Sequence, residues 1–234
     1  MRSLIKNPLL RAVLAAASLG ALAFAANASA GMITIYKNDL DTVDSRAQIH
    51  QVPPNANCVR GGSPDAFRFA LGAKAKECFY RVPMVGQNLQ VSAVARIFQK
   101  TPIKVLKRTY AGVSLRQSTD GSRYQLVVWP YTRRFGLRKV QPDGQILNFG
   151  SRKAGNKVNG PDKANRLTLR AFNGPKGAAQ VIAWVNGHKV ATAGDAQGTS
   201  LVGRDTTLSI GAKAAARGAI GSFSGIRVAI PDPY

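Results

Sequence analysis

Acidic side chains are scarce in this 234-residue chain, which has 11 of them against 33 lysines and arginines. Glu77 is its only glutamate, and the aspartates lie mostly in turn-like sequences. Retaining glycosidases need two carboxyl groups about 5 Å apart, and no i, i+2 pair of carboxylates occurs within a later β-rich segment. The G-x-S-x-G, H-E-x-x-H and P-loop motifs are absent too. The sequence therefore gives no support to these enzyme classes.

Apolar runs long enough to span a bilayer, about 20 residues, are also missing. The longest run, residues 12–26, follows a basic segment and precedes a small-residue A-x-A-like site that ends at Ala30. This order predicts a signal peptide over residues 1–30 that is cleaved after Ala30. The junction carries no cysteine, so a lipoprotein anchor is not expected. We expect the mature chain, residues 31–234, in the periplasm or outside the cell, with no transmembrane segment.

Only two cysteines and two histidines occur in the chain. Export places Cys58 and Cys78 in an oxidising compartment, where a bridge between them would close a loop worth about 3 kcal/mol. A metal site and a reactive thiol are the alternatives, but the histidines, His50 in the leader and His188 in a turn, do not lie near them in sequence. We predict a structural Cys58–Cys78 disulfide.

Positive charge is in large excess, with a formal net charge of +22. Removal of residues 1–30 takes away three basic residues and no acidic ones, which leaves 30 against 11, or +19. Such an excess attracts polyanions, among them lipopolysaccharide phosphates, acidic glycans and anionic lipid head groups. Nucleic acid is not expected as the partner because no recognition motif is present and the chain is exported. A basic surface that only maintains solubility would give the same composition.

Short β-rich segments separated by Gly, Pro, Asn and Asp fill the chain after Glu77, and they predict strands rather than helices. The segments are 78–84, 89–98, 104–107, 111–117, 123–129, 134–139, 145–149, 166–172, 180–186, 188–192, 206–210 and 222–229. Residues 31–57 are interpreted as a leader strand followed by a loop that contains Pro53 and Pro54. Residues 58–234 are expected to form one domain.

Apolar and polar residues alternate along these segments. Val113 and Leu115 oppose Ser114 and Arg116, and the segment 166–172 repeats the pattern. One apolar and one polar face per strand is typical of antiparallel sheets packed as a sandwich. We therefore predict an all-β, antiparallel two-sheet β-sandwich.

The order of several short motifs resembles the concanavalin A-like lectin/glucanase jelly roll, in particular the laminin-G-like and 3-keto-disaccharide-hydrolase-like domains of bacterial envelope proteins. The motifs are AGVSLR (111–116), DGSRYQLVV (120–128), FGLRK (135–139), NRLTLR (165–170), VIAWVNGHKV (181–190) and GSFSGIRV (221–228). The resemblance spans about residues 75–230, implies the jelly-roll fold and says little of function.

Glucanases of that fold carry a Glu-x-Asp-x-x-Glu or Glu-x-Asp-x-Glu strand, which this chain lacks; Asp39 and Asp41 have i, i+2 spacing but lie in the leader. Some laminin-G-like domains hold Ca²⁺ through Asp and Asn side chains and carbonyl oxygens. Asp195 or Asp205 could contribute here, but with so few acids we expect no cofactor.

Candidate binding residues are aromatics that stack on sugars and arginines that grip anionic groups. The segment 129–134 combines two aromatics with two arginines between predicted strands, and nearby strands add two more arginines. The predicted ligand-binding residues are Trp129, Tyr131, Arg133, Arg134, Arg138 and Arg116. Sheet neighbours could gather Arg116, Arg138, Arg166 and Arg170 into one patch, although Trp129 could instead fill the core.

These features predict an exported, non-catalytic module that binds carbohydrate, in particular an anionic glycan or lipopolysaccharide. The alternative is a structural or adhesion module that docks a protein partner or an anionic surface. An atypical glycan hydrolase is a third reading. The sequence does not specify the oligomeric state.

Overall fold

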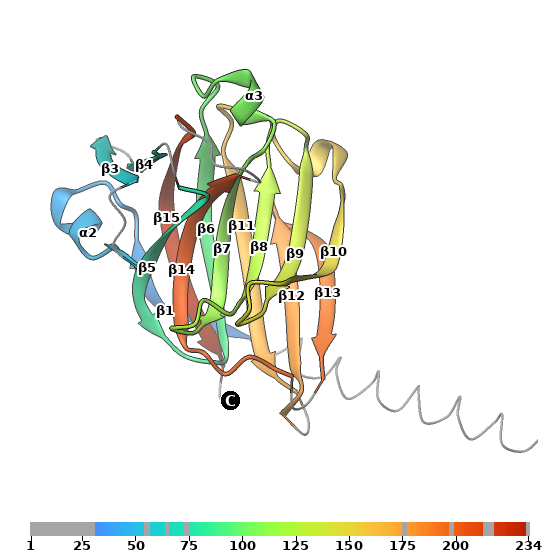
Figure 1. The fold of residues 1–234 in the computed structure, drawn as a ribbon. Helices are drawn as coiled ribbons and strands as arrows, with labels where there is room; N and C mark the ends of the chain where they lie inside the picture. Colours follow the sequence, from blue (N-terminus) through green and yellow to red (C-terminus); the bar gives the residue numbers. More distant parts are fainter. Residues whose placement is uncertain are drawn as a thin grey trace, which may run out of the picture.

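Strands dominate the computed structural model, which describes residues 31–53, 57–63, 66–72, 75–174, 177–196, 199–212 and 218–232. The predicted signal peptide, residues 1–30, lies outside the described residues, as does Pro54 of the leader loop. No helix in the described ranges is long and apolar enough to cross a membrane. Two antiparallel sheets pack face to face (Figure 1), which confirms the predicted all-β sandwich.

The first sheet, sheet A, has the order β13-β12-β11-β6-β15-β4-β3, with β1 paired to β15. Its strands are β1 (Met32–Asn38), β3 (Cys58–Ser63), β4 (Ala66–Leu71), β6 (Leu89–Ile97), β11 (Asn165–Asn173), β12 (Ala179–Val185), β13 (His188–Asp195) and β15 (Ile220–Pro231). The non-sequential order means that residues far apart in the chain become neighbours on the faces of this sheet.

The second sheet, sheet B, has the order β10-β9-β8-β7-β14-β5-β2. Its strands are β2 (His50–Gln51), β5 (Glu77–Val85), β7 (Thr109–Gln117), β8 (Arg123–Trp129), β9 (Arg134–Val140), β10 (Ile146–Lys153) and β14 (Asp205–Ala212). The described residues also form three short helical elements, which are α2 (Val43–Ala47), α3 (Ile103–Leu106) and the 3-10 turn η1 (Gly155–Lys157). In Figure 1, α3 lies at the upper end of the sandwich.

The predicted alternation sets the two faces of each sheet. Val113 and Leu115 on β7 and Leu167 and Leu169 on β11 are fully buried between the sheets. Apolar side chains at every second position exclude water from this core, whereas the intervening positions are left for the outer faces. The outer faces are therefore where polar residues can form a site.

The predicted strand 104–107 is wrong, because residues 103–106 form the helical turn α3. Pro102 starts the turn with φ −52°, and its carbonyl oxygen accepts hydrogen bonds from the N–H groups of Val105 and Leu106. Burial of Leu106 then anchors the turn to the core. The turn thus begins directly after Pro102, whose own backbone is extended with ψ 137°, and these hydrogen bonds and the burial of Leu106 outweigh β propensity here.

The leader segment and the residues around Cys58 contribute more strand than the sequence predicted. β1 pairs with β15 and β2 pairs with β5, so residues 31–57 add strands to both sheets. β3 and β4 also form an antiparallel pair that the sequence analysis missed. In β4, Phe67, Phe69 and Leu71 all point into the core, a period-2 pattern that was available in the sequence.

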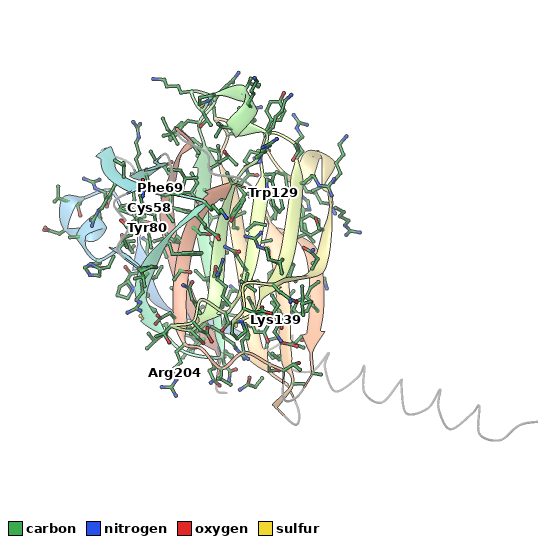
Figure 2. The ribbon with its side chains drawn as sticks, in the orientation of Figure 1. Cys58, Phe69, Tyr80, Trp129, Lys139 and Arg204 are labelled. Atoms are coloured by element: carbon green, nitrogen blue, oxygen red, sulfur yellow. A yellow bond between two sulfur atoms is a disulfide. The ribbon has the colours of Figure 1, made fainter. Side chains whose placement is uncertain are left out.

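The Cys58–Cys78 disulfide is present, with the two Cα atoms 5.8 Å apart. Because Cys58 lies on β3 and Cys78 on β5, the bond joins sheet A to sheet B through the core. Figure 2 labels Cys58 beside Phe69 and Tyr80, whose rings stack with their centroids 5.3 Å apart. The bond therefore fixes the end of β5 on which Glu77 lies.

Loss of this disulfide is expected to lower the free energy of unfolding by about 3 kcal/mol, since the cross-link no longer restricts the unfolded chain. Urea denaturation of the oxidised protein and of the Cys58→Ala/Cys78→Ala variant measures the difference. A reducing agent should destabilise the first and leave the second unchanged. Equal stability of the two proteins would contradict the expectation.

Candidate functional site

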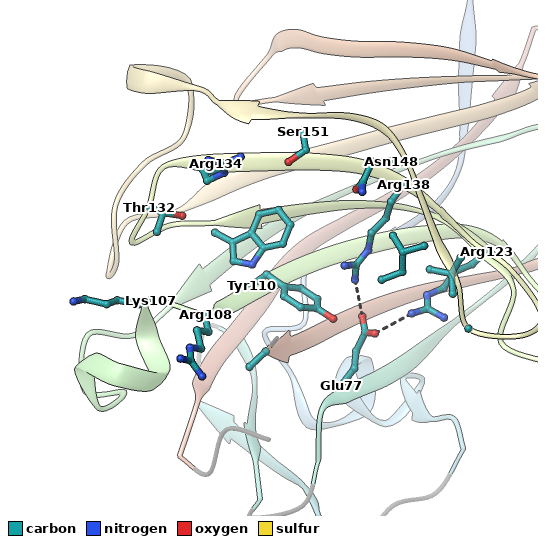
Figure 3. A pocket seen from close by; sticks show the side chains of 15 residues that line it. Glu77, Lys107, Arg108, Tyr110, Arg123, Thr132, Arg134, Arg138, Asn148 and Ser151 are labelled. Atoms are coloured by element: carbon teal, nitrogen blue, oxygen red, sulfur yellow. Dashed lines mark hydrogen bonds and ion pairs between the residues drawn. The ribbon is translucent and has the colours of Figure 1, made fainter. Parts of the chain in front are cut away.

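A groove of about 770 Å³ lies on the outer face of sheet B. It runs over β5, β7, β8, β9 and β10, with the segment after α3 at one end (Figure 3). The lining residues are Glu77, Lys107, Arg108, Tyr110, Arg123, Trp129, Thr132, Arg134, Arg138, Val140, Gly144, Ile146, Asn148, Ser151 and Ala212. Five of these side chains are cationic and one is anionic, so the groove is strongly electropositive.

Glu77 anchors an ionic network on the groove floor. Its carboxylate accepts hydrogen bonds from Arg123 at 2.9 Å and from the Gln125 amide at 2.7 Å, and it lies 3.7 Å from an Arg138 nitrogen. Arg138 Nε also donates to the Gln125 side-chain oxygen at 2.7 Å. Figure 3 shows both guanidinium groups directed at the one carboxylate.

Burial shields this network from water, which strengthens its charge-assisted hydrogen bonds. The side chains of Arg123, Arg138 and Glu77 expose only 8%, 9% and 15% of their surface. Burial lowers the pKa of Arg123, and the adjacent Glu77 carboxylate opposes that shift. The guanidinium stays charged because the ordinary pKa of arginine lies far above neutral pH.

Aromatic rings form the rest of the floor. The Trp129 and Tyr110 rings meet edge to face with centroids 5.6 Å apart, and the Arg138 guanidinium carbon lies 4.8 Å from the Tyr110 centroid. Burial raises the pKa of Tyr110, and the negative charge of Glu77 raises it further. The Tyr110 hydroxyl therefore remains a hydrogen-bond donor at any physiological pH.

Glycines beneath these rings let them lie close to the sheet. A Cβ atom at Gly211 would stand 2.3 Å from the Tyr110 hydroxyl oxygen, and one at Gly136 would stand 3.1 Å from the Trp129 ring. Neither glycine has a positive φ, so the backbone conformation does not require glycine here. Glycine is needed because a ring lies too close for a side chain. The two rings thus depend on glycines of the neighbouring strands.

Three cations on the rim differ from those on the floor. Lys107, Arg108 and Arg134 are exposed, and none of them forms an ion pair with any residue in the described ranges. Figure 3 shows Arg134 near Thr132 and Ser151, which add hydroxyl groups to the same rim. Unpaired cations next to hydroxyls can bind an anionic, polyhydroxylated ligand.

The structure brings together three of the six predicted ligand-binding residues: Trp129, Arg134 and Arg138 all line the groove. Tyr131 and Arg133 lie instead beside a separate pocket of about 220 Å³ at the β8–β9 turn. The Lys107 ammonium group lies 5.8 Å from the Tyr131 ring centroid, at the boundary between the two cavities.

Arg116 does not lie on the groove surface, and the expected four-arginine patch is corrected. Its φ of 55° turns the side chain out of the alternation, and it is buried at 1% exposure. It donates hydrogen bonds to the Gln87 and Leu201 carbonyls and to Asn173. Alternation and pairing place Arg166 and Arg170 on the outer face of sheet A, so Arg138 alone of the four reaches the groove.

The two candidate calcium ligands are engaged by cations. Asp195 forms a buried ion pair with Lys139 at 2.7 Å and accepts hydrogen bonds from Tyr124 and Thr199. Asp205 pairs with Arg81 at 2.7 Å. Across the described ranges, no group of three or more His, Cys, Asp and Glu side chains has the arrangement to hold a metal ion.

Sequence reasoning missed Glu77, Tyr110 and Arg123 as members of the site. All three lie on the polar phase of strands, because Cys78, Ala111 and Tyr124 next to them point into the core. That phase could be derived from the sequence, but the pairing of β5 with β14 and of β14 with β7, which brings Glu77 close to them, could not.

Solved structures with the same architecture exist, although their sequences differ widely from this one. A protein of unknown function with a galectin-like fold from Bacillus subtilis has a TM-score of 0.61 at 12% identity, covering 87% of this chain and 99% of its own. The carbohydrate-binding module CBM66 from Bacillus subtilis has a TM-score of 0.56 at 11% identity, covering 77% and 94%. A Bacteroides ovatus GH16 protein of a mixed-linkage glucan locus, in complex with a G4G4G3G product, has a TM-score of 0.56 at 8% identity, covering 83% and 99%.

No protein-family model matches the sequence, and no curated protein matches it either. The likeness to solved structures and the two antiparallel sheets show that the chain has a concanavalin-like β-sandwich fold, as the sequence motifs predicted. At these identities the comparison shows the fold alone, so function has to be argued from the groove.

Replacement of Glu77 by glutamine is expected to destabilise the protein by about 3–5 kcal/mol, because two buried guanidinium groups lose their counter-charge. Asp205→Asn is the matched control: its partner Arg81 is 42% exposed, so the loss should be at most about 1 kcal/mol. Urea denaturation measures both variants. Equal losses would show that Glu77 does not hold the floor together.

Proposed function

We propose that the protein binds an anionic glycan in the groove on the outer face of sheet B and does not cleave it. The observation that carries this proposal is the groove's set of five cations and one carboxylate, with three of the cations unpaired on the rim. Arginine forks match the two oxygens of a uronate carboxylate or of a sulfate group.

The aromatic floor of the groove favours a ligand whose anionic group is carried by a sugar. Trp129 is half-buried with its ring against Gly136, next to the exposed Arg134, so a sugar face and an acidic substituent can be bound together. A volume of about 770 Å³ lies within the usual range for ligand pockets, roughly 300–1,000 Å³. Solved neighbours described as a carbohydrate-binding module and as a glucan-bound GH16 protein support the same class of ligand.

The single carboxylate favours binding over hydrolysis. Both glycosidase geometries need two carboxyl groups, about 5 Å apart for retention and about 6.5–9.5 Å apart for inversion. Glu77 is the one carboxylate among the groove-lining residues, and two arginines and a glutamine already occupy it.

A glycan array probed at low salt and at about 0.5 M salt tests the proposal. Uronic or sulfated glycans should bind, and part of that binding should survive high salt because the floor contacts are shielded from solvent. Uniform loss of binding would show simple polyanion attraction and favour the adhesion alternative. Shortened products after incubation with a bound oligosaccharide would overturn the non-catalytic assignment.

Calorimetry on an array ligand then locates the site. Arg134→Gln and Trp129→Ala should each weaken binding about tenfold or more, which corresponds to about 1.4 kcal/mol. Arg166→Gln and Trp184→Ala are the matched controls, because they remove the same groups from the outer face of sheet A. Equal weakening by the controls would place the ligand elsewhere.

We also propose that the protein is exported after cleavage at Ala30, on the basis of the predicted signal peptide and supported by the disulfide. Expression of the full chain in a bacterium, followed by N-terminal sequencing of the periplasmic and medium fractions, tests this. A new terminus at Gly31 is expected, and an uncleaved cytoplasmic chain would contradict the proposal.

A further inference from the structure

A second cationic cavity, of about 180 Å³, lies on the outer face of sheet A, on the other side of the core from the groove. It is formed by the adjacent strands β4, β15 and β6. Its lining residues are Ala66, Arg68, Val94, Arg96, Phe98, Ser222 and Ser224. We call it the Arg68–Arg96 pocket.

Strand register creates the pocket. Ser222 on the middle strand is the direct cross-strand partner of both Arg68 on β4 and Arg96 on β6. Neighbouring strands lie about 4.8 Å apart, so the two arginine Cα atoms are about 10 Å apart with a serine between them. Side chains of three directly paired residues point to the same face and can converge above it.

The donors of this row are free. Neither Arg68 nor Arg96 has an ion pair, and neither they nor the Ser222 and Ser224 side chains have a hydrogen bond with any residue in the described ranges. The Arg68 guanidinium carbon lies 5.3 Å from the Phe98 ring centroid, and this contact holds that side chain against one wall. Phe98 is itself half-buried, so the wall is anchored to the sheet.

Two like charges on either side of one serine repel each other, and among the described residues no acidic side chain lines the cavity to offset that repulsion. An anion placed between them would replace repulsion by two charge-assisted hydrogen-bonded contacts. The donors approach from three strands, which suits the three terminal oxygens of a tetrahedral group. A planar carboxylate has only two oxygens and cannot offer a separate oxygen to each of the three side chains.

We propose that the Arg68–Arg96 pocket binds the phosphate group of a phosphate monoester. The two guanidinium groups bind separate oxygens, and the Ser222 hydroxyl donates to a third. The site stands apart from the sheet B groove and does not depend on its proposed function. An exported protein with both sites would bind an anionic glycan on one face and a phosphate-bearing molecule on the other.

Isothermal titration of the full mature protein with inorganic phosphate tests the pocket, with folding checked by circular dichroism. Saturable binding of one equivalent is expected, and Arg68→Gln and Arg96→Gln should each weaken it about tenfold or more, the effect of roughly 1.4 kcal/mol. Both arginines are exposed, so these variants should fold normally. Lys189→Gln removes one exposed charge from β13 of the same sheet and should change the affinity less than twofold.

Equal weakening by Lys189→Gln, or the absence of saturable binding to the unmodified protein, would overturn the proposal. Arg134→Gln on the groove rim should leave phosphate binding intact, so failure of one site is distinguishable from failure of the other. Vesicles of phosphatidylcholine with and without phosphatidic acid identify the source of the phosphate. Binding to the acidic vesicles that inorganic phosphate displaces indicates a lipid head group, whereas phosphate binding without vesicle binding indicates a soluble ester.

Discussion

The carboxylate of Glu77 holds the groove together. Arg123, Arg138 and Gln125 come from two neighbouring strands and meet at this one side chain of a third strand, so their positions are coupled. Arg138 in turn covers the Tyr110 ring, and Tyr110 supports Trp129. The orientation of the aromatic floor thus follows from one buried ionic network. The single glutamate of the sequence thus lies where two desolvated cations would otherwise have no counter-charge.

Two groups of cations in this protein have different roles. Arg116, Arg123, Arg138 and Lys139 are buried and make specific contacts, so they contribute to structure. Lys107, Arg108 and Arg134 on the groove rim and Arg68 and Arg96 on sheet A are exposed and have no anionic partner among the described residues. A formal charge of +22 is therefore a poor guide by itself, because the buried group is not available to a ligand.

The fold was largely predictable from alternation, whereas the site was predictable only in part. Period-2 patterns placed residues such as Val113 and Leu167 in the core correctly, because burial of one face sets the register of a strand. The same rule failed for Arg116, whose left-handed backbone turns it out of phase. It also failed at residues 104–107, where Pro102 starts a helical turn.

Glu77 shows why the remainder of the site was missed. In sequence it stands beside Cys78 and 33 or more residues from every other floor residue; only the strand order β9-β8-β7-β14-β5 brings it to them. Trp129, Arg134 and Arg138 were found because they lie within one short segment, so their proximity needed no knowledge of sheet order. Local sequence reveals a site only when its members come from one hairpin.

The sandwich itself determines how the two proposed sites can influence each other. They lie on opposite sheets separated by a close-packed core, and stacked sheets stand about 10 Å apart. The Cys58–Cys78 bond and the continuous hydrophobic cluster leave no hinge between the sheets within the described part of the chain. Binding at one site is therefore not expected to alter the other site through a conformational change.

Electrostatic interaction between the two bound ligands is the remaining route. At physiological salt the Debye length is about 8 Å, so the ligand on one face is screened by solvent from the ligand on the other. The two proposed sites should consequently bind their ligands independently of each other.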